Sequence, residues 1–343
     1  MFNKIDAYLI TSNENRFYFT GFKSSFGCLI LTPTDKTFIT DMRYAGEARK
    51  FVKGATIIPT TSTNYYDDII KVLKKAGAKS VGFEDASLTV AEHKKLKSEL
   101  EGFTLKPASV DLDEKRMIKT DEEIAKIQEA QSVTQRALSK VMSLIKVGVS
   151  EKDLSNEITY QMLKLGADGP AFDNIVAFGV NTAVPHHRPT SKKLEKNDLI
   201  TIDIGASVNG YCGDMTRTFC LGKPNTKLAQ IHKIVLDAQN YALKNLKAGM
   251  TGREAHLLAS EYITANGYGQ EFTHGLGHGV GIEVHELPTL ALRYDQPLKE
   301  NMVVSVEPGI YIDGLGGVRI EDLVVIKENG IVNLNNFIKN LNV

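Results

Sequence analysis

The first third of the chain alternates short apolar runs with stretches whose apolar residues recur at helical spacing. The predicted strands are CLILT at 28–32, TFIT at 37–40 and SVGFE at 80–84, and the predicted helices cover 65–76 and 87–101. Turn residues Pro33 to Lys36 separate the first two runs. This alternation predicts an α/β domain over residues 1–115. No catalytic cluster lies in it, so we expect any contribution to a site to be indirect.

A long amphipathic helix is predicted next, and it opens a second domain, residues 120–343. Thr120 followed by Glu123 forms a capping box, which signals a helix start. Gly148 ends the pattern. The apolar residues at helical spacing are Ile124, Ile127, Ala130, Ala137, Leu138, Val141 and Ile145.

The second domain repeats itself loosely. The first half has Gly148, Ser150, Gly166, His186, Pro189, Thr190, Asp203 and Gly205, and the second half echoes them with Gly249, Thr251, Gly267, His285, Pro288, Thr289, Glu307 and Gly309. The separation drifts between 99 and 104 residues, which excludes a solenoid with a fixed short period. The repeat predicts two βα halves related by a pseudo-twofold axis.

The segment ITIDIGASVNGYCGDMTRTF has the pattern of a β-hairpin. Isoleucines alternate with residues that include Asp203, and Asn209-Gly210 is a strong two-residue turn signal. Such a turn places Gly205 opposite Asp214 and makes Asp203 and Asp214 diagonal neighbours on one face. Two exposed strand aspartates are the alternative, although an unpaired carboxylate among so many isoleucines would be costly.

SVEPGIYI and VRIEDLVVI predict a second acidic pair. Ser305 and Glu307 share one strand face, and a glycine-rich turn over 309–317 is expected to return the chain to Arg319 and Glu321 on the same face. A salt bridge of Arg319 with residues near Glu321 is the alternative. Four converging carboxylates repel one another unless cations neutralise them.

The block HGLGHGVGIEVHE adds His274, His278 and His285. It matches neither the dinucleotide-binding pattern G-x-G-x-x-G nor the zinc-protease pattern H-E-x-x-H. Any one of these histidines can be structural, but three beside four carboxylates favour a metal site. The predicted metal ligands, a hard set suited to two divalent ions such as Mn²⁺, Co²⁺ or Zn²⁺, are Asp203, Asp214, His278, Glu307 and Glu321.

Composition and charge limit the classes of partner and the cellular compartment that we expect for this protein. Lys+Arg and Asp+Glu both total 41, so we expect neither nucleic acid nor a membrane as a partner. The N-terminal segment lacks a leader pattern, and no apolar run reaches membrane-spanning length. A cytoplasmic protein is therefore expected. The cysteines Cys28, Cys212 and Cys220 form no ligand motif and are predicted to be buried small hydrophobes.

At these motifs the sequence resembles the M24 metallopeptidases with the pita-bread fold, the family of methionine aminopeptidase, Xaa-Pro aminopeptidase and prolidase. The resemblance covers residues 120–343, while residues 1–115 look like the creatinase/prolidase N-terminal domain, which points to the proline-specific branch. It implies an α/β (α+β) architecture, two metal ions per subunit and a homodimer. Metal-free creatinase-like relatives or a binding protein on this fold would be expected to lack the ligands.

The resemblance also assigns roles. Asp203 would bind one ion, Asp214 and Glu321 both, and His278 and Glu307 the second. Glu307 would also shuttle a proton to the leaving nitrogen. The remaining implied roles are leaving-group contact for His186, oxyanion contact for His285, proline-pocket shaping for His274 and orientation of carboxylates by Arg319.

One departure concerns the substrate. Prolidases place an arginine where this chain has Thr289, and such an arginine would bind a dipeptide's free carboxylate. Its absence favours an Xaa-Pro aminopeptidase, which releases the N-terminal residue from peptides with proline second. Xaa-Pro dipeptidase (prolidase) is the alternative, because Arg188 or Arg293 can take over that contact.

Overall fold

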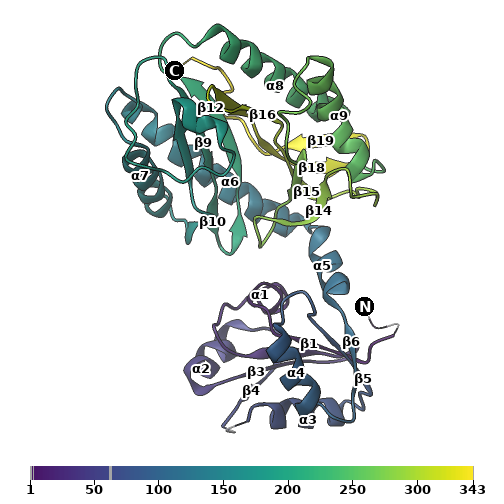
Figure 1. The fold of residues 1–343 in the computed structure, drawn as a ribbon. Helices are drawn as coiled ribbons and strands as arrows, with labels where there is room; N and C mark the ends of the chain where they lie inside the picture. Colours follow the sequence, from purple (N-terminus) through teal and green to yellow (C-terminus); the bar gives the residue numbers. More distant parts are fainter. Residues whose placement is uncertain (1, 3, 62–63, 343) are drawn as a thin grey trace. The chain divides into compact units, whose positions relative to one another are not determined.

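The computed structural model describes residues 2, 4–61 and 64–342 and divides into two compact units, Met1–Arg116 and Met117–Val343 (Figure 1). Each unit is described by itself. None of the described helices is long and apolar enough to cross a membrane.

The first unit is built on a six-stranded mixed sheet with the order β4-β3-β2-β1-β5-β6. Its strands are β1 Ala7–Ile10, β2 Cys28–Leu31, β3 Lys36–Thr40, β4 Thr56–Pro59, β5 Ser80–Phe83 and β6 Thr104–Pro107. Its helices are α1 Asn13–Thr20, α2 Met42–Phe51, α3 Tyr66–Lys75, α4 Val90–Glu99 and α5 Ser109–Met117. The three predicted strands and two predicted helices are confirmed.

Side-chain alternation divides the core of this unit between the two faces of the sheet. On β2, Cys28 and Ile30 pack with α3 and α4, while Leu29 and Leu31 pack with α2 and α5. Figure 1 shows α3 and α4 together on one face of the sheet. Because both faces are covered, these strands read as continuous apolar runs in the sequence.

The second unit holds two similar halves, which we call the first half (residues 121–220) and the second half (residues 226–333). The first half has α6 Asp121–Val141, α7 Glu151–Lys164, β7 Gly169–Pro170, β8 Ile175–Phe178, β9 Leu199–Ile204, β10 Ala206–Val208, β11 Tyr211–Cys212 and β12 Met215–Cys220. The second half has α8 Thr226–Asn245, α9 Gly252–Ala265, β13 Gly277–Gly279, β14 Glu286–Leu290, β15 Val303–Val306, β16 Gly309–Ile312, β17 Gly316–Arg319, β18 Asp322–Lys327 and β19 Gly330–Asn333.

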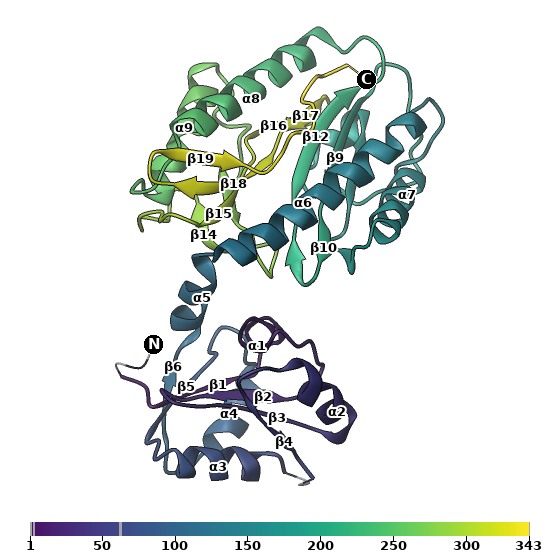
Figure 2. The same cartoon turned by 180° about the vertical axis from the view of Figure 1, so that it is seen from behind.

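Each half buries its strands against its own pair of helices. Figure 2 shows α6 and α7 beside β9 and β12, and α8 and α9 beside the sheet that contains β18 and β19. The two large apolar clusters follow the same division, one built mainly from α6, α7, β9 and β12 and the other from α8, α9, β15 and β18. In each half the strands thus pack against helices, in agreement with the predicted α/β class.

The predicted long helix has one error. The capping box of Thr120 and Glu123 is present, and α6 begins there. The helix ends at Val141, and a 3-10 turn, Met142–Leu144, follows, because the N–H of Ile145 bonds to the carbonyl of Met142. The apolar pattern thus outlasts the α-helix. The three cysteines are buried and free, as predicted.

Candidate dinuclear metal site

The first acidic pair lies on the hairpin that the sequence predicts. Thr216 pairs with Asp203 and Cys212 with Ser207, and the same register puts Gly205 opposite Asp214. Asn209 and Gly210 form the two-residue turn, with φ of 51° and 79°, as a type I′ turn requires. A side chain at Gly205 would meet the carbonyl oxygen of Gly213 at 2.1 Å, so only glycine fits this close approach.

The second acidic pair follows the same plan with one correction. Val303 pairs with Val325 and Val306 with Asp322, and this register puts Glu307 directly opposite Glu321. The stretch 309–317 was expected to be a turn, but most of it forms β16 and β17, which continue the pairing in a two-stranded sheet. Glycine has low strand propensity, which concealed these strands in the sequence.

His278 reaches the carboxylates from β13. The flanking Gly277 lets this strand pass close to β15, because a Cβ there would meet the carbonyl oxygen of Ser305 at 2.0 Å. Ser305 accepts a hydrogen bond from the backbone N–H of His278 (3.0 Å) and donates one to Oε1 of Glu307 (2.9 Å). Ser305 therefore holds two predicted ligands in place, a role that the sequence did not reveal.

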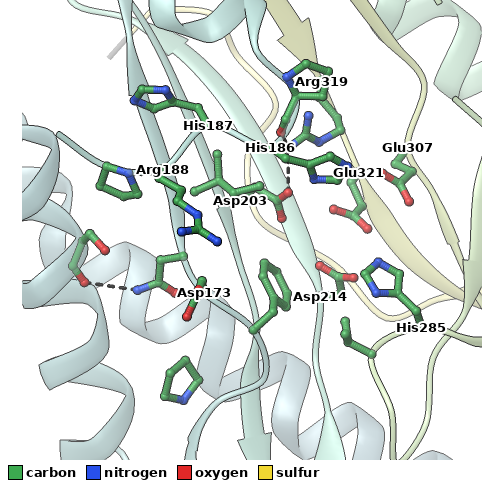
Figure 3. Close-up of a pocket in the computed structure, with 18 of the residues that line it drawn as sticks. Asp173, His186, His187, Arg188, Asp203, Asp214, His285, Glu307, Arg319 and Glu321 are labelled. Carbon is green, nitrogen blue, oxygen red and sulfur yellow. Dashed lines mark hydrogen bonds and ion pairs between the residues drawn. The ribbon is translucent and has the colours of Figure 1, made fainter. Parts of the chain in front are cut away.

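All nine residues predicted for the site line one pocket of about 770 Å³, which Figure 3 shows in close-up. The set consists of His186, Asp203, Asp214, His274, His278, His285, Glu307, Arg319 and Glu321. The first half supplies three of them and the second half six. A pocket of this size suits a small organic ligand or short peptide.

Three of the predicted ligands lie close enough together to hold a metal ion. One ligand atom each from Asp214, His278 and Glu321 lies within 4.8 Å of the others. Oδ1 of Asp203 and Oε1 of Glu321 are buried without a hydrogen-bond partner among the described residues. Such orphaned carboxylate oxygens are costly unless a cation takes up their lone pairs. Asp203 and Glu307 lie beside this trio, held respectively by Arg319 and by His278.

The carboxylates of the cluster are electrostatically unfavourable in their ionised form. Burial, with the charges of neighbouring carboxylates, raises the pKa of Asp214 and of Glu321 well above the usual range. Burial would also raise the pKa of Glu307, but the hydrogen bond and charge of His278 outweigh it and lower that pKa to about 2. The cluster therefore holds more negative charge than its own cations neutralise, which is the environment that divalent ions stabilise.

Arg319 supports the first half from the second. Its Nη2 donates to Oδ2 of Asp203 at 2.6 Å, and its Nη1 donates to the hydroxyl of Tyr311 at 2.7 Å. Tyr311 also lies 2.9 Å from Nε2 of His274. Thr216 accepts from Nε of Arg319 at 3.1 Å and donates to Glu321 at 2.7 Å. A continuous polar network thus joins His274, Tyr311, Arg319 and both acidic pairs.

The comparisons with known proteins agree with this geometry. The model of the metallopeptidase family M24 matches residues 125–328, and the model of the creatinase/prolidase N-terminal domain matches residues 3–118. The chain belongs to metallopeptidase family M24. Its predicted fold class, an N-terminal creatinase/prolidase-type domain followed by a pita-bread catalytic domain, is confirmed.

This M24 chain is similar along nearly its whole length to an uncharacterized peptidase, to a protein named Xaa-Pro dipeptidase and to a protein named X-Pro aminopeptidase. An uncharacterized peptidase of Bacillus subtilis (strain 168) is 41% identical and aligned over 95% of this chain and 92% of its own. The structure of an Xaa-Pro dipeptidase from Bacillus anthracis is 40% identical with a TM-score of 0.95, covering 99% and 95% of the two chains. The structure of an X-Pro aminopeptidase from Thermotoga maritima MSB8 is 36% identical with a TM-score of 0.93, covering 99% and 98%.

His285 lies against a predicted ligand of this metallopeptidase. Its ring centroid is 4.2 Å from that of His278, with the planes at 61°. Burial, then the charge of His278, lowers the pKa of His285, so its ring is neutral near pH 7. A neutral imidazole still carries one N–H that can donate a hydrogen bond into the pocket.

Two contacts between acidic side chains and the segments that carry the pocket histidines were missed in the sequence. In the first half Glu151 is fully buried and lies 2.9 Å from Nε2 of His187, the residue after His186. In the second half Glu286, the residue after His285, pairs at 2.7 Å with the buried Lys119. In each half, the residue that follows the pocket histidine is therefore held by a charged side chain from another segment of the unit, Glu151 for His187 and Lys119 for Glu286. Only the repeat of the two His-x-x-Pro-Thr segments hinted at this.

The two arginines considered for binding a substrate carboxylate, Arg188 and Arg293, differ in whether they line the pocket. Arg188 lines the pocket, whereas Thr289 and the exposed Arg293 are absent from the described residues that line it. Of the two arginines considered from the sequence, the structure therefore brings only Arg188 to the site.

Proposed function

We propose that this chain hydrolyses the Xaa-Pro bond at the N-terminus of peptides and releases the first residue, as an Xaa-Pro aminopeptidase does. The observation that carries the proposal is the single pocket in which all nine predicted residues meet. Relatives named Xaa-Pro dipeptidase and X-Pro aminopeptidase support the proline-directed substrate class. We assign residues 1–115 to the N-terminal domain and residues 120–343 to the catalytic domain.

The proposed cofactor is a pair of divalent ions, Mn²⁺, Co²⁺ or Zn²⁺, whose identity a hard ligand set leaves open. Asp203 would hold one ion, His278 and Glu307 the other, and Asp214 and Glu321 both. When bound, such ions polarise the scissile carbonyl and acidify a water placed between them. The unpartnered oxygens of Asp203 and Glu321 support this assignment.

The chain's own residues would bind and move protons around that centre. Glu307, whose low pKa keeps it ionised, would accept a proton and pass it to the leaving nitrogen. His285 would donate a hydrogen bond to the oxygen that gains negative charge at the scissile carbonyl. His186 would contact the leaving group, and His274 would shape the proline pocket through Tyr311. Arg319 would orient Asp203.

A second candidate, the Xaa-Pro dipeptidase, is favoured by one observation. Arg188 lines the pocket, and a guanidinium there suits the free carboxylate of a dipeptide. The homodimer that the family resemblance implies is also part of the proposal, and sedimentation of the purified protein tests it.

The test is hydrolysis of Ala-Pro, Ala-Pro-Ala and Met-Ala-Ala by the purified chain with added Mn²⁺ or Co²⁺. Cleavage of Ala-Pro-Ala supports the aminopeptidase, and cleavage of Ala-Pro alone supports the dipeptidase. Cleavage restricted to Met-Ala-Ala would contradict the proline-directed function, as would no cleavage of any of the three.

A further inference from the structure

Arg188 is a charged residue of the pocket that has no role in the proposed aminopeptidase chemistry. It lies on the segment between the 3-10 turn η2, Gly179–Ala183, and β9, and Figure 3 shows its side chain on the side of the pocket away from Glu307 and His285. Among the described residues, no oxygen lies within ion-pair or hydrogen-bond distance of its guanidinium. The guanidinium therefore has all its donors available for a ligand.

The backbone on both sides of Arg188 is fixed. Oε2 of the buried Glu151 lies 2.9 Å from Nε2 of His187 and accepts from the N–H of Thr190 at 2.8 Å and from its hydroxyl at 2.6 Å. Oε1 of Glu151 accepts from the side chain of Asn181 at 2.8 Å. Because its neighbours are anchored, the position of Arg188 is largely set before a ligand arrives, which lowers the entropic cost of binding.

Among the described residues, the second half has no cation at the position equivalent to Arg188. By the repeat, that position is Leu287, which packs against the apolar core of that half. The preceding residue, Glu286, is paired with Lys119, and Arg319, the cation that the second half does bring to the pocket, is paired with Asp203. The unpaired cation thus comes from the first half, and this asymmetry between the halves is a feature of this sequence.

Two further charges line the pocket. Among the described lining residues outside the acidic cluster and its partner Arg319, Lys152 on α7 and the exposed Asp173 carry opposite charges, so Arg188 adds one positive charge that no other residue of this group balances. A guanidinium presents paired N–H groups that match the two oxygens of a carboxylate. Neither a neutral amide nor an ammonium group offers the same match.

We propose that Arg188 binds a carboxylate of the peptide substrate and thereby selects which Xaa-Pro peptides are cleaved. This inference rests on the proposed function. The carboxylate is either the free C-terminus of a dipeptide or an acidic side chain of a longer peptide, and both present the same group to the guanidinium.

The experiment compares the wild type with Arg188→Met, Arg188→Lys and the control Arg293→Met, which lies outside the pocket. Three matched pairs of substrates differ only in the carboxylate: Ala-Pro and its C-terminal amide, Glu-Pro-amide and Gln-Pro-amide, and Ala-Pro-Glu-amide and Ala-Pro-Gln-amide. Circular dichroism and metal content on each variant show that the fold and the metal centre are kept.

In at least one pair, Arg188→Met should lower kcat/KM for the carboxylate member about 10- to 100-fold, mainly through KM, and leave the amide member unchanged. Arg188→Lys should fall between, because an ammonium binds as a point charge. Arg293→Met should match the wild type. The pair that responds identifies the source of the carboxylate.

Equal loss for both members of every pair would mean a structural role and overturn the proposal, as would unaltered kinetics of Arg188→Met. If the wild type cleaves none of the proline peptides, the proposed function is wrong and the inference falls with it. If the wild type cleaves the proline peptides and Arg188→Met prefers carboxylate over amide substrates to the same degree as the wild type, only the inference about Arg188 is overturned.

Discussion

The two halves of the catalytic unit present the same backbone plan with different side chains. The first half places Asp203 and Asp214 diagonally across its hairpin, whereas the second half places Glu307 directly opposite Glu321. The basic groups that contact these carboxylates in the described residues come from the second half, His278 beside Glu307 and Arg319 beside Asp203. A repeated fold thus builds an asymmetric site, in which one half provides bare carboxylates and the other provides both the carboxylates and the groups that orient them.

The hydrogen bonds that support the ligand strands are similar in the two halves, although the site itself is asymmetric. Gln131 on α6 bonds to both backbone groups of Asp214, and Gln239 on α8 bonds to the carbonyl of Val306, the residue before Glu307. Both glutamines are fully buried. Each half therefore uses a helix glutamine to hold the ligand strand.

The largest expected effect comes from removing a ligand that both ions are proposed to share. Asp214→Asn should reduce bound metal from two ions per chain towards one or none and abolish peptide hydrolysis, because an amide cannot replace an anionic bridging ligand. Glu321→Gln should do the same from the other half. Metal analysis and kinetics on dialysed protein measure both effects. Asp295→Asn, an exposed carboxylate paired with Arg253, is the control. Full activity in Asp214→Asn would remove the dinuclear assignment.

The next effect concerns the ion pair that joins the halves. Arg217 on β12 pairs with Asp322 on β18 at 2.9 Å, with both side chains at most 1% exposed. Arg217→Met should lower the free energy of unfolding by about 3–5 kcal/mol, because it removes one partner of a buried pair. Arg253→Met, which removes an exposed pair, should cost at most about 1 kcal/mol. Urea denaturation measures both, and equal costs would show that the pair of Arg217 and Asp322 adds no more stability than an exposed pair.

The two mirrored histidines separate chemistry from binding. His285→Ala should keep both metals and lose about 10²–10³ in kcat, the usual loss for one oxyanion donor. His186→Ala, its counterpart in the first half, should act more through KM. Steady-state kinetics on an Xaa-Pro tripeptide, with metal content on the same samples, distinguishes them. A change confined to KM in His285→Ala would make that histidine a binding residue.

The smallest expected effect is the pH dependence of stabilisation by metal. The raised pKa values of Asp214 and Glu321 mean that, without metal, the stability these groups contribute as neutral carboxyls is present at low pH and lost as pH rises through those raised values. Glu307 acts in the opposite sense, because its pKa of about 2 adds stability that is lost only as pH falls from about 4.5 towards 2. Added Mn²⁺ should therefore raise Tm more at pH 8 than at pH 5, since binding requires ionised carboxylates. Thermal scans with and without Mn²⁺ measure this, and a Tm increase independent of pH would contradict it.

The sequence was sufficient where local rules decide the outcome. The Asn209-Gly210 turn fixed the register of the first hairpin, and period-two alternation then placed Asp203 and Asp214 on one face. The same alternation placed Glu307 and Glu321 together even though the strands that extend their pairing were mistaken for a turn.

Contacts between distant segments were not predictable in this way. Ser305, Tyr311 and Glu151 act through hydrogen bonds whose partners depend on how sheets and loops pack, and nothing in their local spacing indicates those partners. Gly317 approaches the carbonyl of Thr182 so closely that a Cβ would lie 2.4 Å from it. That glycine appeared to signal a turn, whereas its structural reason is a tertiary contact.

If the two acidic pairs, one from each half, together hold two metal ions, both ions should be visible in crystals grown with Mn²⁺. Anomalous diffraction from such crystals should show two peaks about 3.5–4 Å apart, both within ligand distance of Asp214 and Glu321. A single peak, or none, in crystals of protein that cleaves Ala-Pro or Ala-Pro-Ala would contradict the two-metal assignment.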